Sequence, residues 1–250
     1  FKQKTAYEIG VRLVGSEMCI RDRTIDNSPS RLREQVDTSL KRLKTDFIDL
    51  LYLHAPDPNC DLFETAAVMR SFLEQGKART IGVSNFSVSQ LESFHAICPI
   101  TATQPAFNML QRDIERDVVP WCLQHSVSVV VYWPLMKGLL AGKLPRDHQF
   151  DTKDGRAKYP MFQGEEWQKN QDFVDQLRSF ADSINRTVAQ VVINWTIQRP
   201  GITVALCGAK RAYQIEETAI SMEFELTTAE LATIDSLLED RGDPITRPAV

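Results

Sequence analysis

The stretch that decides the fold is DFIDLLYLHAPD, at residues 46–57. Residues 46–53 are apolar at almost every position, and the run is too short for a typical buried helix. A continuous apolar run of this length indicates a strand that is buried on both faces. The run ends at His54, with Pro56 close behind, so the sequence places an imidazole at the end of a buried strand.

Helical periodicity recurs on both sides of this strand. Ser28 and Pro29 are typical of an N-cap followed by proline at the first helical position. The second helix is expected to end at Gly76, since glycine favours the turn that follows a helix. The predicted apolar faces are Leu32, Val36, Leu40 and Leu43 in the first helix, and Phe63, Ala66, Met69, Phe72 and Leu73 in the second.

The same alternation continues to the end of the chain. Capping boxes open two of the predicted helices, with Ser87 and Gln90 in one and Thr187 and Gln190 in the other. Further strands are predicted over 79–83, 101–106, 127–133 and 202–206, helices over 87–96, 113–124, 167–184, 188–198, 211–220 and 228–239, and a polar loop over 142–165. Short strands alternating with helices indicate a parallel sheet, either doubly wound or closed into a (β/α)8 barrel. No GxGxxG motif is present, and periodicity alone does not choose between the two architectures.

Composition narrows the classes of function. The chain has 250 residues, of which 43% are hydrophobic and 25% charged, as expected for one large α/β domain with a sizeable core. The net charge is −4 with both signs interspersed, which argues against nucleic-acid and membrane-surface partners. No apolar run is long enough to cross a bilayer. The five cysteines, at 19, 60, 98, 122 and 207, show neither close pairs nor zinc spacing, so a cytoplasmic location is expected.

Polar side chains follow each of the five predicted strands. In both architectures ligands bind at the carboxyl ends of parallel strands. Taken singly, each of these residues has a plainer structural interpretation, such as a turn residue or a solvated lysine. Together they would suit a flat ring that bears an amide, and a phosphate. They are His54, Ser84-Asn85, Gln104, Tyr132-Trp133-Pro134-Leu135 and Gly208-Ala209-Lys210.

Several strings, in this order, resemble the aldo-keto reductase family. They are SLKRLKTDFIDLLYLHAPD, ARTIGVSNFS, QPAFNML, YWPLMKGLLAGK and CGAKRAYQIEET, and the resemblance covers residues 24–250. It implies a (β/α)8 TIM barrel that is incomplete, with strands four to eight present and strands one to three missing. It also implies reduction of aldehydes or ketones, as small-molecule substrates, with hydride from NADPH or NADH.

The resemblance assigns roles to individual residues. His54 matches the histidine that orients the substrate carbonyl. Ser84, Asn85 and Gln104 match the positions that hold the nicotinamide carboxamide, and Tyr132 matches the aromatic residue that stacks on the ring. The other implied cofactor-binding residues are Leu135 and Lys143 near the pyrophosphate, Gly208 and Lys210 at the adenosine-phosphate end, and Gln214 and Glu217 at the adenosine. No metal ligands are implied.

The sequence also departs from the family pattern. Trp133 stands where serine is common, Thr218 where asparagine is usual, and Phe107 where tyrosine is frequent. The family's proton donor is a tyrosine tuned by a lysine and an aspartate, and residues 24–250 offer no match for these three. Tyr7 and Lys4 do not qualify, because they fall within residues 1–23, which resemble a different kind of sequence.

Residues 1–23 resemble the translation of sequencing-library adapters, in the strings KQKTAYEI and LVGSEMCIRDR. The native sequence in this chain is therefore expected to begin near Thr24, with the true amino-terminal part missing, so that residues 24–250 form a partial barrel. Such a fragment should be almost inactive and should fold poorly, because an open barrel leaves two strand edges unpaired. Two alternatives stay open: a non-catalytic cofactor-binding module or partner subunit, and a metal-dependent hydrolase.

Overall fold

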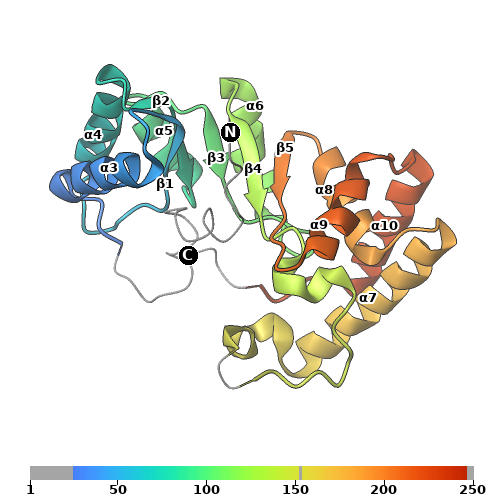
Figure 1. Ribbon diagram of the computed structural model, residues 1–250. Coiled ribbons are helices and arrows are strands. Elements are labelled where there is room, and N and C mark those ends of the chain that lie inside the picture. The colour runs from blue at the N-terminus through green and yellow to red at the C-terminus, as the bar shows by residue number, and fades with distance from the viewer. Residues whose placement is uncertain (1–24, 152–153, 247–250) are drawn as a thin grey trace. The chain divides into compact units, whose positions relative to one another are not determined.

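The structure is a computed structural model that describes residues 25–151 and 154–246 (Figure 1). The chain forms two compact units, Phe1–Gln104 and Pro105–Val250. The predicted adapter-derived segment, residues 1–23, lies outside the described residues. Each unit is an arrangement of parallel strands and helices, as the alternation in the sequence predicts.

The first unit is built on three parallel strands in the order β1-β2-β3. The strands are β1 (Ile48–Leu53), β2 (Ala78–Ser84) and β3 (Ala102–Gln104), and the helices are α3 (Pro29–Leu43), α4 (Leu62–Glu74) and α5 (Val88–His95). Helix α4 packs on β2 and contacts both α3 and α5. The pairing of Leu53 with Val83, and of Ser84 with Gln104, aligns the carboxyl ends of the three strands.

The second unit contains two parallel strands, β4 (Ser128–Tyr132) and β5 (Ile202–Leu206). Its helices are α6 (Val118–His125), α7 (Gly164–Ser183), α8 (Val188–Gln198), α9 (Ala212–Ala219) and α10 (Thr228–Arg241), with short 3-10 turns η1 (Asp113–Glu115), η2 (Met136–Ala141), η3 (Gly155–Lys158), η4 (Pro160–Phe162) and η5 (Ile220–Met222). Helix α8 packs on β5, and α6 packs on β4.

Local sequence explains where the helices start. Both predicted capping boxes are confirmed: the Ser87 and Thr187 side chains accept from the backbone N–H of Gln90 and Gln190, whose side chains reach back in return. Thr227 and Glu230 form a third box, at the start of α10. Each box satisfies backbone donors that a helix start would otherwise leave unpaired.

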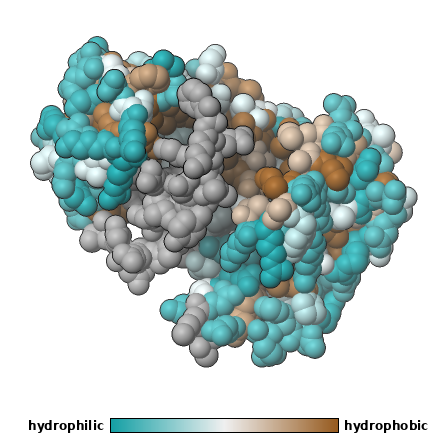
Figure 2. All heavy atoms as spheres, viewed as in Figure 1, coloured by the Kyte–Doolittle hydropathy of each residue, from teal (hydrophilic) through white to brown (hydrophobic). Residues whose placement is uncertain are grey.

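Large apolar side chains fill each unit. Phe72, Ile81 and Phe94 are fully buried in the first unit. In the second, Phe107 and Trp195 stack with ring centroids 5.8 Å apart, and both are fully buried. Strand β5 is the contrast, because Val204 and Leu206 stay more than two-fifths exposed. Figure 2 shows apolar surface around this strand.

Several predicted details are wrong. Phe63, assigned to an apolar helix face, is 60% exposed, because Thr65, Ala66 and Met69 carry the buried face of α4. The predicted strand 101–106 is only three residues long, since Pro105 has no N–H to donate to a sheet. The predicted loop 142–165 contains η3 and η4 and runs into α7 at Gly164. The predicted helix 113–124 divides into η1 and α6.

None of the helices in the described part of the chain is both long enough and apolar enough to span a membrane.

Asn194, on α8, holds three backbone groups of the following segment, and we predict that removing its side chain destabilises the fold. Its Nδ2 donates to the carbonyls of Ser221 and Phe224, at 2.8 and 2.6 Å, and its Oδ1 accepts from Leu226 N at 3.2 Å. At about 1 kcal/mol for each bond, Asn194→Ala should lower the free energy of unfolding by about 3 kcal/mol in urea titrations.

Thr196→Val is the matched control, since Thr196 is equally buried on the same helix and makes one bond, to Val192 O. It should lower the free energy of unfolding by about 1 kcal/mol. Equal losses for the two variants would contradict the proposed role of Asn194.

Candidate functional site

Four predicted site residues meet at the carboxyl ends of β1, β2 and β3. Asn85 Nδ2 donates to the backbone carbonyl of His54 at 3.1 Å and to Ser84 Oγ at 3.0 Å. Ser84 Oγ donates in turn to the backbone carbonyl of Gln104 at 2.6 Å. One chain of hydrogen bonds therefore ties three strand ends together and brings the positions of His54, Ser84, Asn85 and Gln104 close to one another, while their role as a binding site stays a prediction.

The backbone at Asn85 makes this chain possible. Its φ is +62°, in the left-handed region that asparagine adopts more readily than most residues. The turn takes the chain out of β2 and brings the Asn85 side chain back over the end of β1, where it meets His54 O. The Ser-Asn pair thus serves both as a turn and as a source of polar groups.

His54 is half-buried, and burial lowers the pKa of its imidazole below the ordinary value of 6.5. The neutral form therefore dominates at pH 7, and protonation requires a more acidic solution than it would for a free histidine. A neutral imidazole carries one N–H donor and can hydrogen-bond a carbonyl oxygen.

Tyr52 is a residue that the sequence analysis missed. It lies two residues before His54, on the same side of β1, and pairs with Gly82. A Cβ on Gly82 would lie 2.5 Å from a Tyr52 ring atom, so only glycine leaves room for the ring. The period-two spacing from His54, opposite a glycine in the neighbouring strand, is the signal that could have found it.

The hydroxyl of Tyr52 is buried, and no hydrogen-bond partner reaches it. Burial raises its pKa, while the nearby Gln104 side chain lowers it by a smaller amount without reaching hydrogen-bond geometry. Buried hydroxyls are normally paired, and the Gln104 side chain is the polar group that lies near this one.

The second unit carries the other predicted residues. The Lys143 ammonium forms an ion pair with Glu217 on α9 and lies 5.4 Å from the centre of the Tyr213 ring. Gln214 Oε1 accepts from the backbone N–H groups of Lys210 and Arg211, at 2.7 and 3.0 Å. The structure thus joins the Lys210 backbone to Gln214 at the start of α9. It also joins the Lys143 side chain to Glu217, further along the same helix.

Gly208 and Leu135 lie in the loops after β5 and β4, respectively, as predicted. Leu135 stands directly before η2, and Tyr132 is the last residue of β4. Each unit therefore brings together its own share of the predicted residues. That the two sets form one site stays a prediction.

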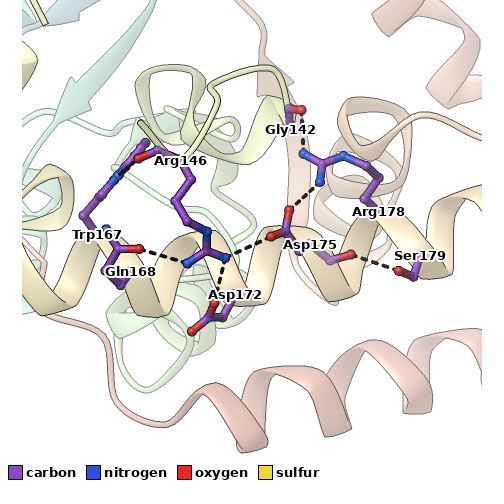
Figure 3. A network of polar contacts seen from close by, with 8 residues as sticks. All are labelled: Gly142, Arg146, Trp167, Gln168, Asp172, Asp175, Arg178 and Ser179. Carbon is purple, nitrogen blue, oxygen red and sulfur yellow. Dashed lines mark hydrogen bonds and ion pairs between the residues drawn. The ribbon is translucent and has the colours of Figure 1, made fainter. Parts of the chain in front are cut away.

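A polar network fixes the loop that carries Lys143 (Figure 3). Arg146 bonds Gln168, Asp172 and Asp175 along α7, at 2.9, 2.7 and 2.9 Å. Arg178 joins Asp175 to the carbonyl of Gly142, which precedes Lys143. Exposed ion pairs contribute little singly, but this set, in which Arg146 and Arg178 share Asp175, holds both ends of a short segment.

Three potential metal ligands lie together in the first unit, and they are already occupied. Asp26, Asp57 and Cys60 have ligand atoms within 4.8 Å of one another. Asp57 accepts from the backbone N–H of Asn59 and Asn27 and from the Cys60 thiol, and these bonds lower its pKa. The cluster is accounted for by the turn that it stabilises.

Comparison with known proteins identifies the family. The sequence model of the aldo/keto reductase family matches residues 9–239. The chain belongs to the aldo/keto reductase family. Aldo-keto reductase YhdN of Bacillus subtilis is 35% identical over 218 residues, which are 86% of this chain and 66% of that protein. Aldo-keto reductase str7 of Strobilurus tenacellus is 31% identical, covering 90% of this chain and 68% of that protein.

Comparison with solved structures leads to the same family. Glycerol dehydrogenase AKR11B4 from Gluconobacter oxydans matches with a TM-score of 0.83 and 31% identity, over 90% of this chain and 68% of that one. The thermostable aldo-keto reductase Tm1743 matches with a TM-score of 0.67 and 28% identity, over 84% of this chain and 67% of that one. This aldo/keto reductase chain therefore spans about two thirds of the length of the relatives that it matches.

The contact between Tyr52 and Gly82 yields a prediction about stability. Gly82→Ala should lower the free energy of unfolding by about 1–3 kcal/mol, because the added methyl group overlaps the Tyr52 ring. In a Tyr52→Leu background the same change should cost far less, and urea titration of the four proteins measures the coupling. Additive losses would show that the ring does not depend on the space above Gly82.

Proposed function

We propose that this chain carries the carbonyl-binding and cofactor-binding face of an NAD(P)H-dependent reductase of aldehydes and ketones. The observation that carries the proposal is the hydrogen-bond chain that links His54, Asn85, Ser84 and Gln104. Membership of the aldo/keto reductase family supports it. The proposed architecture is a (β/α)8 barrel of which the described strands are the fourth to eighth.

The residues at this strand edge suit a nicotinamide carboxamide, which both donates and accepts hydrogen bonds. The Gln104 side-chain amide can offer both functions, and it lies near the Tyr52 hydroxyl. When bound, the cofactor would supply hydride to the carbonyl carbon. Ser84, Asn85 and Gln104 would fix which face of the ring meets the substrate.

His54 would orient the substrate. Its neutral imidazole can donate to the carbonyl oxygen, where negative charge develops as hydride arrives. The family's proton donor is a tyrosine, and residues 24–250 offer no match for it. We therefore expect little turnover from the 250-residue chain by itself.

The second unit would bind the rest of the cofactor. Tyr132 would stack on the nicotinamide, and Leu135 and Lys143 would lie near the pyrophosphate. Gly208 and Lys210 would contact the adenosine-phosphate end, where the Lys210 cation favours NADPH over NADH, and Gln214 and Glu217 would contact the adenosine. A relative from Schizosaccharomyces pombe, 28% identical, is named aldo-keto reductase yakc [NADP(+)], which supports this preference.

A non-catalytic cofactor-binding module is the second candidate, because residues 24–250 offer no match for the family's proton donor. The genomic sequence upstream of Thr24 separates the two. An aspartate, a tyrosine and a lysine in the family's pattern there would support the enzyme. Their absence, together with tight NADPH binding and no turnover of any carbonyl, would support the module.

His54→Gln tests the catalytic proposal, in whichever form turns over: this chain, or a chain extended with its upstream sequence. Glutamine keeps a donor but not the position of the imidazole. We expect kcat/KM to fall by roughly 100-fold, the typical worth of a donor to a developing oxyanion, with NADPH affinity changed less than twofold. Equal losses in both quantities would show that His54 is structural.

Lys210→Met tests the cofactor preference. Removing the cation should weaken NADPH binding by about tenfold while leaving NADH binding unchanged, as a charge-assisted phosphate contact predicts. Lys169→Met, at an exposed site on α7, is the control. Fluorescence titration with both cofactors measures the effect, and equal weakening of the two would refute the role of Lys210.

A further inference from the structure

The turn after β4 has an unusual backbone. Trp133, Met136 and Lys137 have φ values of +63°, +44° and +54°, and Gly138 follows at +96°. Bulky residues rarely adopt the left-handed region. At Trp133 the conformation is more unusual still, because the residue before a proline is restricted to extended backbone. Such strain persists only where the surrounding structure holds it in place.

The strain has a visible result in the placement of the Trp133 ring. Successive side chains of a strand point to opposite faces, so Tyr132 and Trp133 would normally diverge. Instead their ring centroids lie 5.2 Å apart with the planes at 81°, an edge-to-face pair. Trp133 thus braces Tyr132, which is the residue proposed to stack on the nicotinamide.

Lys137 holds Trp133 in that position. Its Nζ lies 4.0 Å from the centre of the Trp133 ring and 4.9 Å from the centre of the Tyr159 ring, so the ammonium contacts two aromatic rings. A cation at this distance from an aromatic face is attracted by the ring quadrupole, which makes the potential above the face negative. Lys137 is half-buried, which strengthens the attraction relative to a fully solvated lysine.

The backbone of Lys137 is held as well. Its carbonyl accepts from Arg156 Nη1 at 3.2 Å, and Asp154 Oδ2 in turn accepts from Arg156 Nε and Nη2, at 3.0 and 2.6 Å. The 154–159 segment is therefore joined to the turn through both the ammonium and the carbonyl of one residue. These contacts supply the support that the left-handed backbone requires.

We propose that Lys137 is a positioning residue for the cofactor: by binding the rings of Trp133 and Tyr159 it keeps Trp133 against Tyr132 and so sets the surface on which the nicotinamide stacks. The inference rests on the proposed role of Tyr132 in cofactor binding. It assigns a purpose to Trp133, which departs from the serine common in the family.

Binding of two probes tests the proposal: NADPH, and 2′,5′-ADP, which lacks the nicotinamide. Lys137→Met keeps the length of the side chain and removes the charge. It should weaken NADPH about fivefold, as expected for loss of a cation–π contact, and change 2′,5′-ADP less than twofold. Lys137→Arg should restore the affinity, because a guanidinium also stacks on aromatic rings. Lys158→Met, at an exposed lysine in η3, is the control.

The outcomes separate the possible roles of Lys137. Equal weakening of both probes would show that the ammonium binds phosphate directly, and would overturn the proposal. So would unchanged NADPH binding in Lys137→Met, or a failure of arginine to restore it. A loss shared by all variants, the Lys158 control included, would mark general unfolding and would likewise count against a specific role.

Tryptophan fluorescence gives a readout that does not depend on cofactor binding. Lys137→Met should shift the emission of the wild-type chain, but not that of a Trp133→Phe chain, in which the affected ring is absent. If the wild-type chain binds neither probe, the proposed cofactor function fails by itself. The fluorescence shift then decides whether Lys137 holds Trp133, and identical shifts in both backgrounds would refute that role.

Discussion

The first unit depends on one constraint: three parallel strands must end at the same level, with their last polar groups satisfied. Asn85 meets it by donating to His54 O and to Ser84 Oγ, and Ser84 extends the chain to Gln104 O. Because these bonds consume backbone carbonyls at the strand ends, they fix the backbone that carries His54 and Gln104. His54 directly follows β1 and Gln104 ends β3, so both positions are held close to the sheet, as a precise site requires.

The second unit solves a different problem, since its candidate residues lie in connections after β4 and β5. There the chain relies on side-chain networks. Arg146 and Arg178 anchor residues 142–146 to α7, and Gln214 holds the backbone of Lys210 at the start of α9. Charged and amide side chains thus hold loop backbone in this unit, whereas in the first unit the Ser84 and Asn85 side chains hold the strand ends.

Local chemistry explains which parts of the fold were predictable. Capping boxes at Ser87 and Thr187 involve residues three apart, so the sequence reveals them directly. The burial of Phe63 was mispredicted because periodicity marks an apolar stripe but not which neighbour covers it. The helical turns within 142–165 were missed because short 3-10 turns have too few residues to show a period.

The site divides in the same way. The strand-end positions of His54, Ser84, Asn85 and Gln104 were predictable from the sequence because each stands where an apolar run ends, and parallel strands share their carboxyl edge. Tyr52 and Lys137 were not found, since one depends on the space above Gly82 in the next strand and the other on a ring twenty-two residues away. The sequence by itself determined the alternation of strands and helices, the strand-end residues and the family strings. Only the tertiary structure decided which side chains touch across strands and loops, because those contacts depend on strand register and on left-handed turns that no local pattern encodes.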